Sequence, residues 1–330
     1  MTDTSMPEAL RRMAEKGRMT AEDVLVLRRK VFTDGVVETH EAEWLFALND
    51  ACGDDSNAPE WPVFFVEALV DHTVHQAEPH GYVSPDNGRW LVERISANGT
   101  AKTRTELELL VKVLEQSRTS PDDLVGFALS QVKSAVIEGS GPVRSGASLQ
   151  PGRVGKAEVE LLRRILYASG GAGNIAVTRT EAELLFDIND ATRTAGNDPN
   201  WADLFVKAIA NHLLAGHAHD VPPREVALAH AKWLAEPPGG FISAMANGLK
   251  GIWQAYRQPD AWGERIERQN STIRSAERID AREADWLAGR LARYGELRDH
   301  EIALIRFLIK ESPEADPVLR PLVEKAAMAV

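Results

Sequence analysis

The sequence predicts an all-α protein made of two tandem homologous helical-bundle domains plus a C-terminal partial third repeat. Apolar residues recur at helical spacing along the chain, and one stretch of sequence is present twice, at residues 39–51 and again at 180–191. Pairs of like residues 140 positions apart are Glu41 and Glu181, Glu43 and Glu183, Phe46 and Phe186, Asn49 and Asn189, Asp50 and Asp190, Trp61 and Trp201, and His72 and His212.

The first domain, residues 1–138, is expected to hold a series of helices separated by glycine-containing breaks. Residues that cap helix starts mark several of them, namely Thr20 with Asp23, Ser84 before Pro85, and Thr103 with Glu106. The expected helices cover residues 6–17, 20–32, 39–51 and 61–75, one opening at Pro85 that contains Trp90, and two more that contain residues 107–114 and 124–136.

Residues 139–153 are rich in Gly, Ser and Pro, which indicates a linker. The second domain is expected at 154–260. Residues 157–167 match residues 22–32, Trp233 matches Trp90, and residues 241–256 form a further helix. Residues 261–330 are expected to hold a polar connector at 263–278 and C-terminal helices that start a third repeat at Ile279.

The composition is that of a soluble globular protein, with 44% hydrophobic and 26% charged residues. A formal charge of −11 disfavours nucleic acid and anionic membrane surfaces as partners, and favours neutral, basic or cationic ones. The single cysteine, Cys52, excludes an internal disulfide. Because we find neither an export signal nor an apolar run long enough to cross a bilayer, we expect a cytoplasmic protein without membrane insertion.

Four breaks between helices share one pattern, in which a glycine is followed two positions later by an apolar residue and then by a glutamate that opens the next helix. The four glycines are Gly35, Gly99, Gly173 and Gly295. We expect the glycine to adopt the left-handed conformation and the glutamate to face the unpaired N–H groups of the next helix.

The clearest of these turns, residues 32–43, resembles a turn of the tellurite-resistance B-like (TerB-like) helical domains. That resemblance implies an all-helical bundle, a link to stress responses, and acidic residues that hold a metal, here Asp34, Glu38 and Glu41. The spacing of Gly35 and Glu41 also equals that in an EF-hand loop. Since Lys30 and Phe32 stand where an EF-hand has acidic ligands, ordinary calcium binding is not expected.

Two sets of residues are candidates for a site. A divalent cation is a possible cofactor, and its candidate ligands are acidic residues near turns and helix ends: Asp34, Glu38, Glu41, Asp50, Asp54, Asp55, Asp190 and Asp198. A partner groove would use polar and aromatic residues that recur in both copies: Asn49, Trp61, His72, Trp90, Asn189, Trp201, His212 and Trp233. For each set the plainer interpretation is structural, with satisfied polar groups and buried tryptophans in the core.

We therefore expect a non-enzymatic helical repeat protein that acts as a protein-interaction or stress-response scaffold. The alternative is a metal-responsive or metal-buffering protein that binds divalent cations through the acidic Asp-Gly turns. A third possibility, an enzyme with a site between the two halves, has only the histidines and the Asn-Asp pairs as candidate residues.

Overall fold

The computed structural model describes residues 6–31, 35–53, 56–97, 99–139, 141–142, 151–169, 177–215, 279, 281–311, 319–322 and 324. The chain forms two compact units, unit 1 from Met1 to Pro151 and unit 2 from Gly152 to Val330. The predicted all-α class is confirmed.

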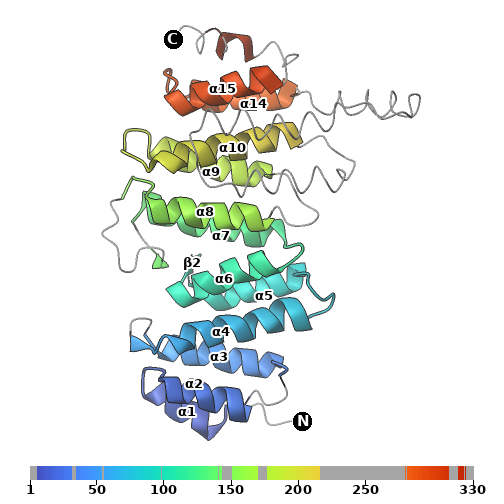
Figure 1. Ribbon diagram of the computed structural model, residues 1–330, viewed down its shortest axis with the longest axis vertical. Coiled ribbons are helices and arrows are strands. Elements are labelled where there is room, and N and C mark those ends of the chain that lie inside the picture. The colour runs from blue at the N-terminus through green and yellow to red at the C-terminus, as the bar shows by residue number, and fades with distance from the viewer. Residues whose placement is uncertain are drawn as a thin grey trace, which may run out of the picture. The chain divides into compact units, whose positions relative to one another are not determined.

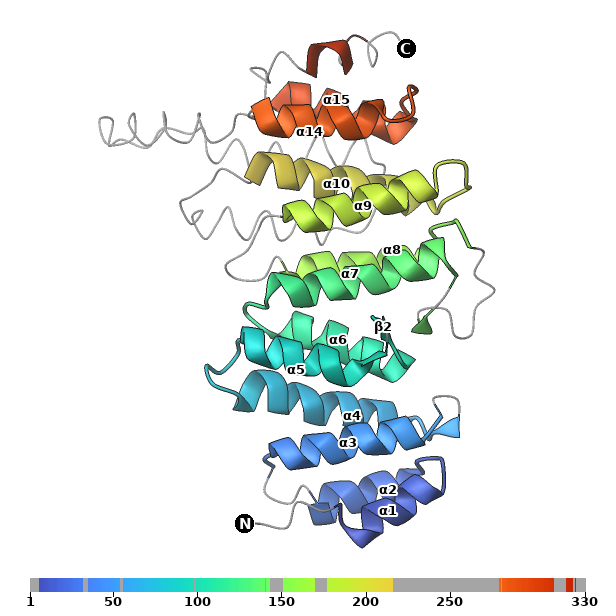
Figure 2. The same ribbon diagram turned by 180° about the vertical axis from the view of Figure 1, so that it is seen from behind.

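The described residues of unit 1 form helices and one pair of two-residue antiparallel strands around the turn at Gly99. Figures 1 and 2 show its helices in successive pairs, α1 with α2, α3 with α4, and α5 with α6. Its elements are α1 (Glu8–Glu15), α2 (Ala21–Val26), the π-helical turn η1 (Leu27–Val31), α3 (Thr39–Ala51), α4 (Glu60–Val70), the π-helical turn η3 (Asp71–Gln76), α5 (Pro85–Ile95), β1 (Ser96–Ala97), β2 (Thr100–Ala101), α6 (Arg104–Gln116) and α7 (Asp122–Ile137).

The helix starts expected from capping residues are confirmed. Thr20 caps α2 and Thr103 caps α6, each with an acidic residue three positions later that accepts the backbone N–H of the cap. Ser84 caps α5 through a 3.1 Å hydrogen bond from the backbone N–H of Asn87.

The glycine–glutamate turn also has its expected geometry in the described residues. Gly35, Gly99 and Gly295 have φ angles of 73°, 81° and 75°, which is the left-handed region that favours glycine. The glutamate then accepts a backbone N–H at the start of the following helix. These bonds are 2.9 Å for Glu41, 3.0 Å for Glu106 and 2.8 Å for Glu301.

Helix α4 is central to unit 1 and packs against α2, α3 and α6. Its apolar residues Trp61, Phe65 and Leu69 are fully buried. Phe65 meets Phe46 of α3 edge to face, with ring centroids 5.4 Å apart. Burial of such large side chains is the main source of stability for the bundle.

Unit 2 repeats this packing. Its described helices are α8 (Lys156–Ser169), α9 (Arg179–Ala191), α10 (Pro199–Ala215), α14 (Ala281–Ala292) and α15 (Asp299–Glu311). Helix α10 packs against α8, α9 and α15, as α4 packs against α2, α3 and α6. The predicted helix 241–256, the connector 263–278 and Trp233 lie outside the described residues.

The described C-terminal helices pack against helices of unit 2. Residues from Ile279 onward were expected to start a third repeat, but α15 packs on α10, and α14 contacts α9 through Trp286 and Arg290. We infer that α14 and α15 are the counterparts of α5 and α6 and complete the second unit. The sequence match was lost because residues 216–280 lie between α10 and α14, whereas only residues 77–84 lie between η3 and α5.

In the part of the chain that the structure describes, no helix has both the length and the apolar character needed to span a membrane.

Candidate functional site

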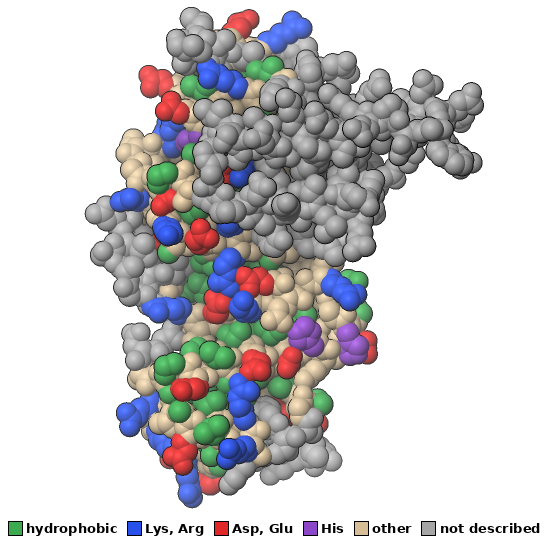
Figure 3. Space-filling model, in the orientation of Figure 1, with side chains coloured by type: hydrophobic (Ala, Val, Ile, Leu, Met, Phe, Trp, Pro, Cys, Tyr) green, Lys and Arg blue, Asp and Glu red, His purple; other side chains and the backbone are tan. Residues whose placement is uncertain are grey.

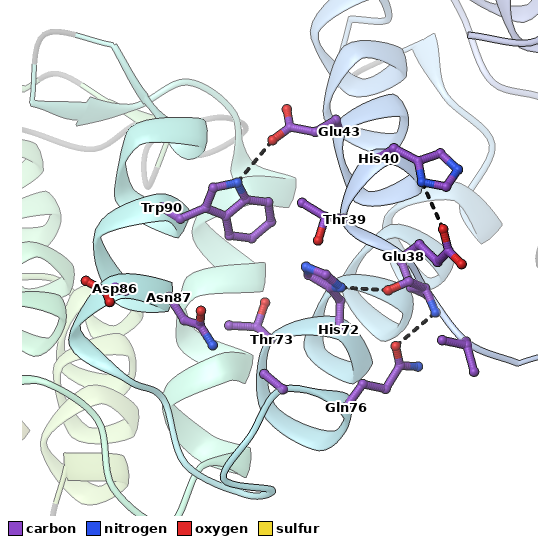
Figure 4. A pocket seen from close by; sticks show the side chains of 13 residues that line it. Glu38, Thr39, His40, Glu43, His72, Thr73, Gln76, Asp86, Asn87 and Trp90 are labelled. Atoms are coloured by element: carbon purple, nitrogen blue, oxygen red, sulfur yellow. Dashed lines mark hydrogen bonds and ion pairs between the residues drawn. The ribbon is translucent and has the colours of Figure 1, made fainter. Parts of the chain in front are cut away.

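A groove of about 1020 Å³ lies in unit 1 where the start of α3, the turn η3 and the start of α5 meet (Figure 4). It contains two of the residues predicted for a partner groove, His72 and Trp90, and one predicted metal ligand, Glu38. The thirteen lining residues are Val36, Val37, Glu38, Thr39, His40, Glu43, His72, Thr73, Gln76, Ala77, Asp86, Asn87 and Trp90.

One wall of the groove is fixed by hydrogen bonds between η3 and the segment before α3. The Nδ1 atom of His72 lies 2.7 Å from the carbonyl oxygen of Val37, and the backbone N–H of Val37 donates to Oε1 of Gln76 at 2.9 Å. Because a carbonyl only accepts, Nδ1 of His72 must carry the proton. In the neutral ring Nε2 is then an acceptor, which is able to bind an N–H group in the groove.

The adjoining wall is the indole of Trp90. Its Nε1–H donates to Oε1 of Glu43 at 3.0 Å, and the same oxygen is 2.9 Å from Nε of Arg94. The ring also meets Phe46 and His72 edge to face, at 5.7 and 5.4 Å between centroids. The indole is therefore held in one orientation, while part of its surface stays accessible.

The groove is acidic. Glu38, Glu43 and Asp86 contribute three carboxylates, whereas none of the thirteen lining residues is Lys or Arg. On the face of unit 1 shown in Figure 3, by contrast, acidic and basic side chains are intermixed. Two of the carboxylates already contact cationic groups at the rim, Glu43 through Arg94 and Asp86 through Arg89. The local field favours a cation.

Unit 2 contains the same histidine, tryptophan and glutamate arrangement. Nδ1 of His212 lies 2.8 Å from the carbonyl oxygen of Val177, and Nε1–H of Trp286 donates to Oε1 of Glu183 at 2.6 Å. The rings of His212 and Trp286 are 5.3 Å apart. Trp286 is thus the structural counterpart of Trp90, a role that the sequence comparison had given to Trp233.

The two arrangements differ at the first residue of the helix that carries the glutamate. In unit 2 this residue is Arg179, whose guanidinium carbon lies 3.9 Å from the centroid of the Trp286 ring and whose Nε is 3.2 Å from Oε1 of Glu183. In unit 1 it is Thr39, which Figure 4 shows beside Trp90. A short neutral side chain therefore stands at the edge of the groove where unit 2 has its own cation.

The other residues predicted for the partner groove are buried where the structure describes them, and Trp233 lies outside the described residues. Trp61 and Asn49 are buried, and the Trp61 Nε1–H donates to Oδ1 of Asn49 at 3.1 Å. In unit 2 the buried Asn189 instead bonds to His300 and Glu301, at 2.9 and 3.0 Å. Burial lowers the pKa of His300 to about 4, so that its ring is neutral at pH 7. Trp201 is buried as well, and its Nε1 has no hydrogen-bond partner among the described residues.

This contrast gives a testable result. Trp61→Phe and Trp201→Phe remove similar volumes from corresponding core positions, but only Trp61→Phe leaves an asparagine oxygen without its donor. We expect Trp61→Phe to cost about 1–3 kcal/mol more than Trp201→Phe in free energy of unfolding. Hydrogen exchange of amides in α4 and α10 measures each unit separately. Equal losses would show that the Trp61–Asn49 bond contributes nothing.

The predicted metal ligands have structural contacts where they are described. Glu38 and Glu41 form the turn before α3, and Asp50 pairs with Lys102 at 2.9 Å. Asp190 pairs with Arg293 at 3.0 Å, and Asp198 accepts a backbone N–H at the start of α10. No group of three or more His, Cys, Asp or Glu side chains suited to a metal ion occurs among the described residues. Asp34, Asp54 and Asp55 lie outside them, so that metal binding there stays a prediction.

Comparisons of the chain with protein families, with curated proteins and with solved structures found no match.

Proposed function

We propose that this protein is a non-enzymatic helical scaffold that binds a partner protein through the groove of unit 1. The observation that carries the proposal is the Trp90 indole, which is fixed by Glu43 and Phe46 but remains partly accessible in a groove of about 1020 Å³. Rigid, partly exposed tryptophans are characteristic anchor points of protein interfaces, because they offer a large contact area at little entropic cost.

The negative charge of the molecule favours a basic partner. The chain has a formal charge of −11, and the groove contributes three carboxylates without a lining Lys or Arg. A basic segment would therefore be attracted over a distance of about 8 Å at physiological salt. The stress-linked role that the TerB-like resemblance implies stays a prediction.

The test is to block the groove without disturbing the fold. Thr39→Arg places a long side chain over Trp90, and Arg179 shows that the first turn of the equivalent helix accepts arginine. The matched control is Ala51→Arg, which adds the same charge to an exposed position of the same helix about 18 Å away. We expect affinity capture followed by quantitative mass spectrometry to show partners that are retained by the wild type and by Ala51→Arg but lost from Thr39→Arg.

Thermal unfolding of both variants serves as the check on folding. If folded Thr39→Arg retains every partner at the yield of the wild type, the groove is not the binding site.

A further inference from the structure

In unit 2 the Trp286–Glu183 pair binds a cation from the same unit, the guanidinium of Arg179. The Arg179 guanidinium stacks on the Trp286 ring at 3.9 Å, and its Nε lies 3.2 Å from the Glu183 carboxylate. The same carboxylate accepts the indole N–H, which fixes the angle between ring and anion. An aromatic face combined with a carboxylate at its edge suits the flat, delocalised charge of arginine.

Unit 1 has the same receptor groups in the same relation. The distance from Trp90 Nε1 to Glu43 Oε1 is 3.0 Å, and Arg94 approaches Glu43 as Arg290 approaches Glu183, at 2.9 and 3.4 Å. Thr39 replaces the arginine, and its side chain is too short to cover the indole. The ring face that is stacked in unit 2 therefore borders the groove in unit 1.

The groove also offers acceptors beyond Glu43. Figure 4 shows Asn87 and the ring of His72 near Trp90, whereas the Glu38 carboxylate faces His40 and the Asp86 carboxylate points away, where Arg89 contacts it. With Nδ1 of His72 donating to the Val37 carbonyl, Nε2 is the acceptor of the neutral ring. A guanidinium has five N–H donors in a rigid plane, whereas the lysine ammonium is a compact, strongly hydrated charge, so that the arrangement favours arginine.

We propose that the groove of unit 1 binds an arginine side chain of a partner protein, stacked on Trp90 and paired with Glu43 as Arg179 is with Trp286 and Glu183. This inference rests on the proposed function, and it specifies the residue that the partner supplies. Unit 2 does not bind such a residue at its corresponding position, because Arg179 already occupies it.

The experiment titrates the ¹⁵N-labelled full chain with the blocked tripeptide acetyl-Gly-Arg-Gly-amide and follows the indole N–H signals, with that of Trp90 assigned through Trp90→Phe. We expect a saturable shift of the Trp90 signal. The lysine tripeptide should bind more weakly than the arginine tripeptide. The citrulline tripeptide, which has the same shape without the charge, should bind at least about 10-fold more weakly than the arginine tripeptide. Thr39→Arg should abolish the shift and Ala51→Arg should keep it.

A second variant, Arg179→Thr, tests the same inference through a gain of binding. In the wild type we expect no shift of the Trp286 signal, because Arg179 covers that ring. Arg179→Thr should open the second site, so that the Trp286 signal shifts with the arginine tripeptide. Equal binding of the citrulline tripeptide, or no shift at Trp90, would overturn the inference. If the arginine tripeptide failed to shift Trp90 but Thr39→Arg still lost its partners in the capture experiment, the inference would fall and the proposed function would stand. If folded Thr39→Arg retained every partner, the proposed function would fall and the inference with it.

Discussion

Leu287→Asp is expected to unfold the second unit. Leu287 is fully buried on α14, next to the Trp286 and Arg290 side chains that contact α9. Burying an unpaired carboxylate in an apolar site costs several kcal/mol, which is comparable to the 5–15 kcal/mol total stability of a typical domain. Hydrogen exchange should therefore show loss of protection in α9 and α10 as well as in α14.

The matched control is Ala281→Asp, which places the same charge at the exposed first residue of α14. There the carboxylate faces the free N–H groups of the helix start and should be neutral or mildly stabilising. If Leu287→Asp left the protection of α9 and α10 unchanged, α14 and α15 would be an independent third repeat, as the sequence had suggested.

Glu106→Gln is expected to stabilise unit 1 above neutral pH. Glu106 is fully buried, and one carboxylate oxygen has no hydrogen-bond partner among the described residues. Burial raises the pKa of Glu106 from 4.5 to about 7. Because the folded pKa is the higher one, this carboxyl favours the folded state fully below pH 4.5, and that contribution is lost as the pH rises through 7. The loss amounts to about 3 kcal/mol.

Glutamine keeps the oxygen that accepts the Thr103 N–H and cannot ionise. The gain from Glu106→Gln should thus be near zero at pH 4.5, grow to at most about 3 kcal/mol at pH 7, and stay constant above that. Hydrogen exchange of α6 amides, corrected for intrinsic rates, measures it.

Glu301→Gln provides the opposite control for this prediction. In unit 2 the corresponding carboxylate is paired with Arg298 and Arg193, at 3.2 and 3.4 Å. Removing its charge should leave two half-buried guanidinium groups without this anion and destabilise unit 2 at neutral pH. If Glu106→Gln destabilised unit 1 to the same extent at pH 8, the Glu106 carboxylate would be a net contributor to stability.

Much of the fold could be predicted from local signals. Helix starts follow from capping chemistry, as at Thr20, Ser84 and Thr103, and the left-handed glycines follow from the spacing of Gly35 and Glu41. Both partners of each of these interactions lie within a few positions of each other, so that a short stretch of sequence is enough to predict them. The short strand pair around Gly99 and the π-helical turns were not predicted, because they depend on small departures from helical geometry.

The candidate site was predicted only in part. His72 and Trp90 were selected because their residue types recur, but Asn49 and Trp61 recur equally well and are buried. A residue type that recurs at corresponding positions indicates a shared fold, but it does not distinguish a core position from a surface position. Trp286 was missed because the sequence match ended at the long segment after α10. The two sites differ most at Thr39 and Arg179. The sequence does not show the importance of this difference, because the Trp286 ring on which Arg179 stacks is 107 positions away along the chain.

The separation of the two halves of unit 2 along the chain also affects the order of events during synthesis. The Glu43–Trp90 contact joins residues 47 positions apart, whereas the Glu183–Trp286 contact joins residues 103 positions apart. A ribosome that adds about 5–20 residues per second leaves α9 and α10 without α14 and α15 for on the order of 5–20 s. Throughout that interval α9 and α10 lack the contacts that Trp286 and α15 later supply, whereas in unit 1 the partner of Glu43 follows after only 47 positions.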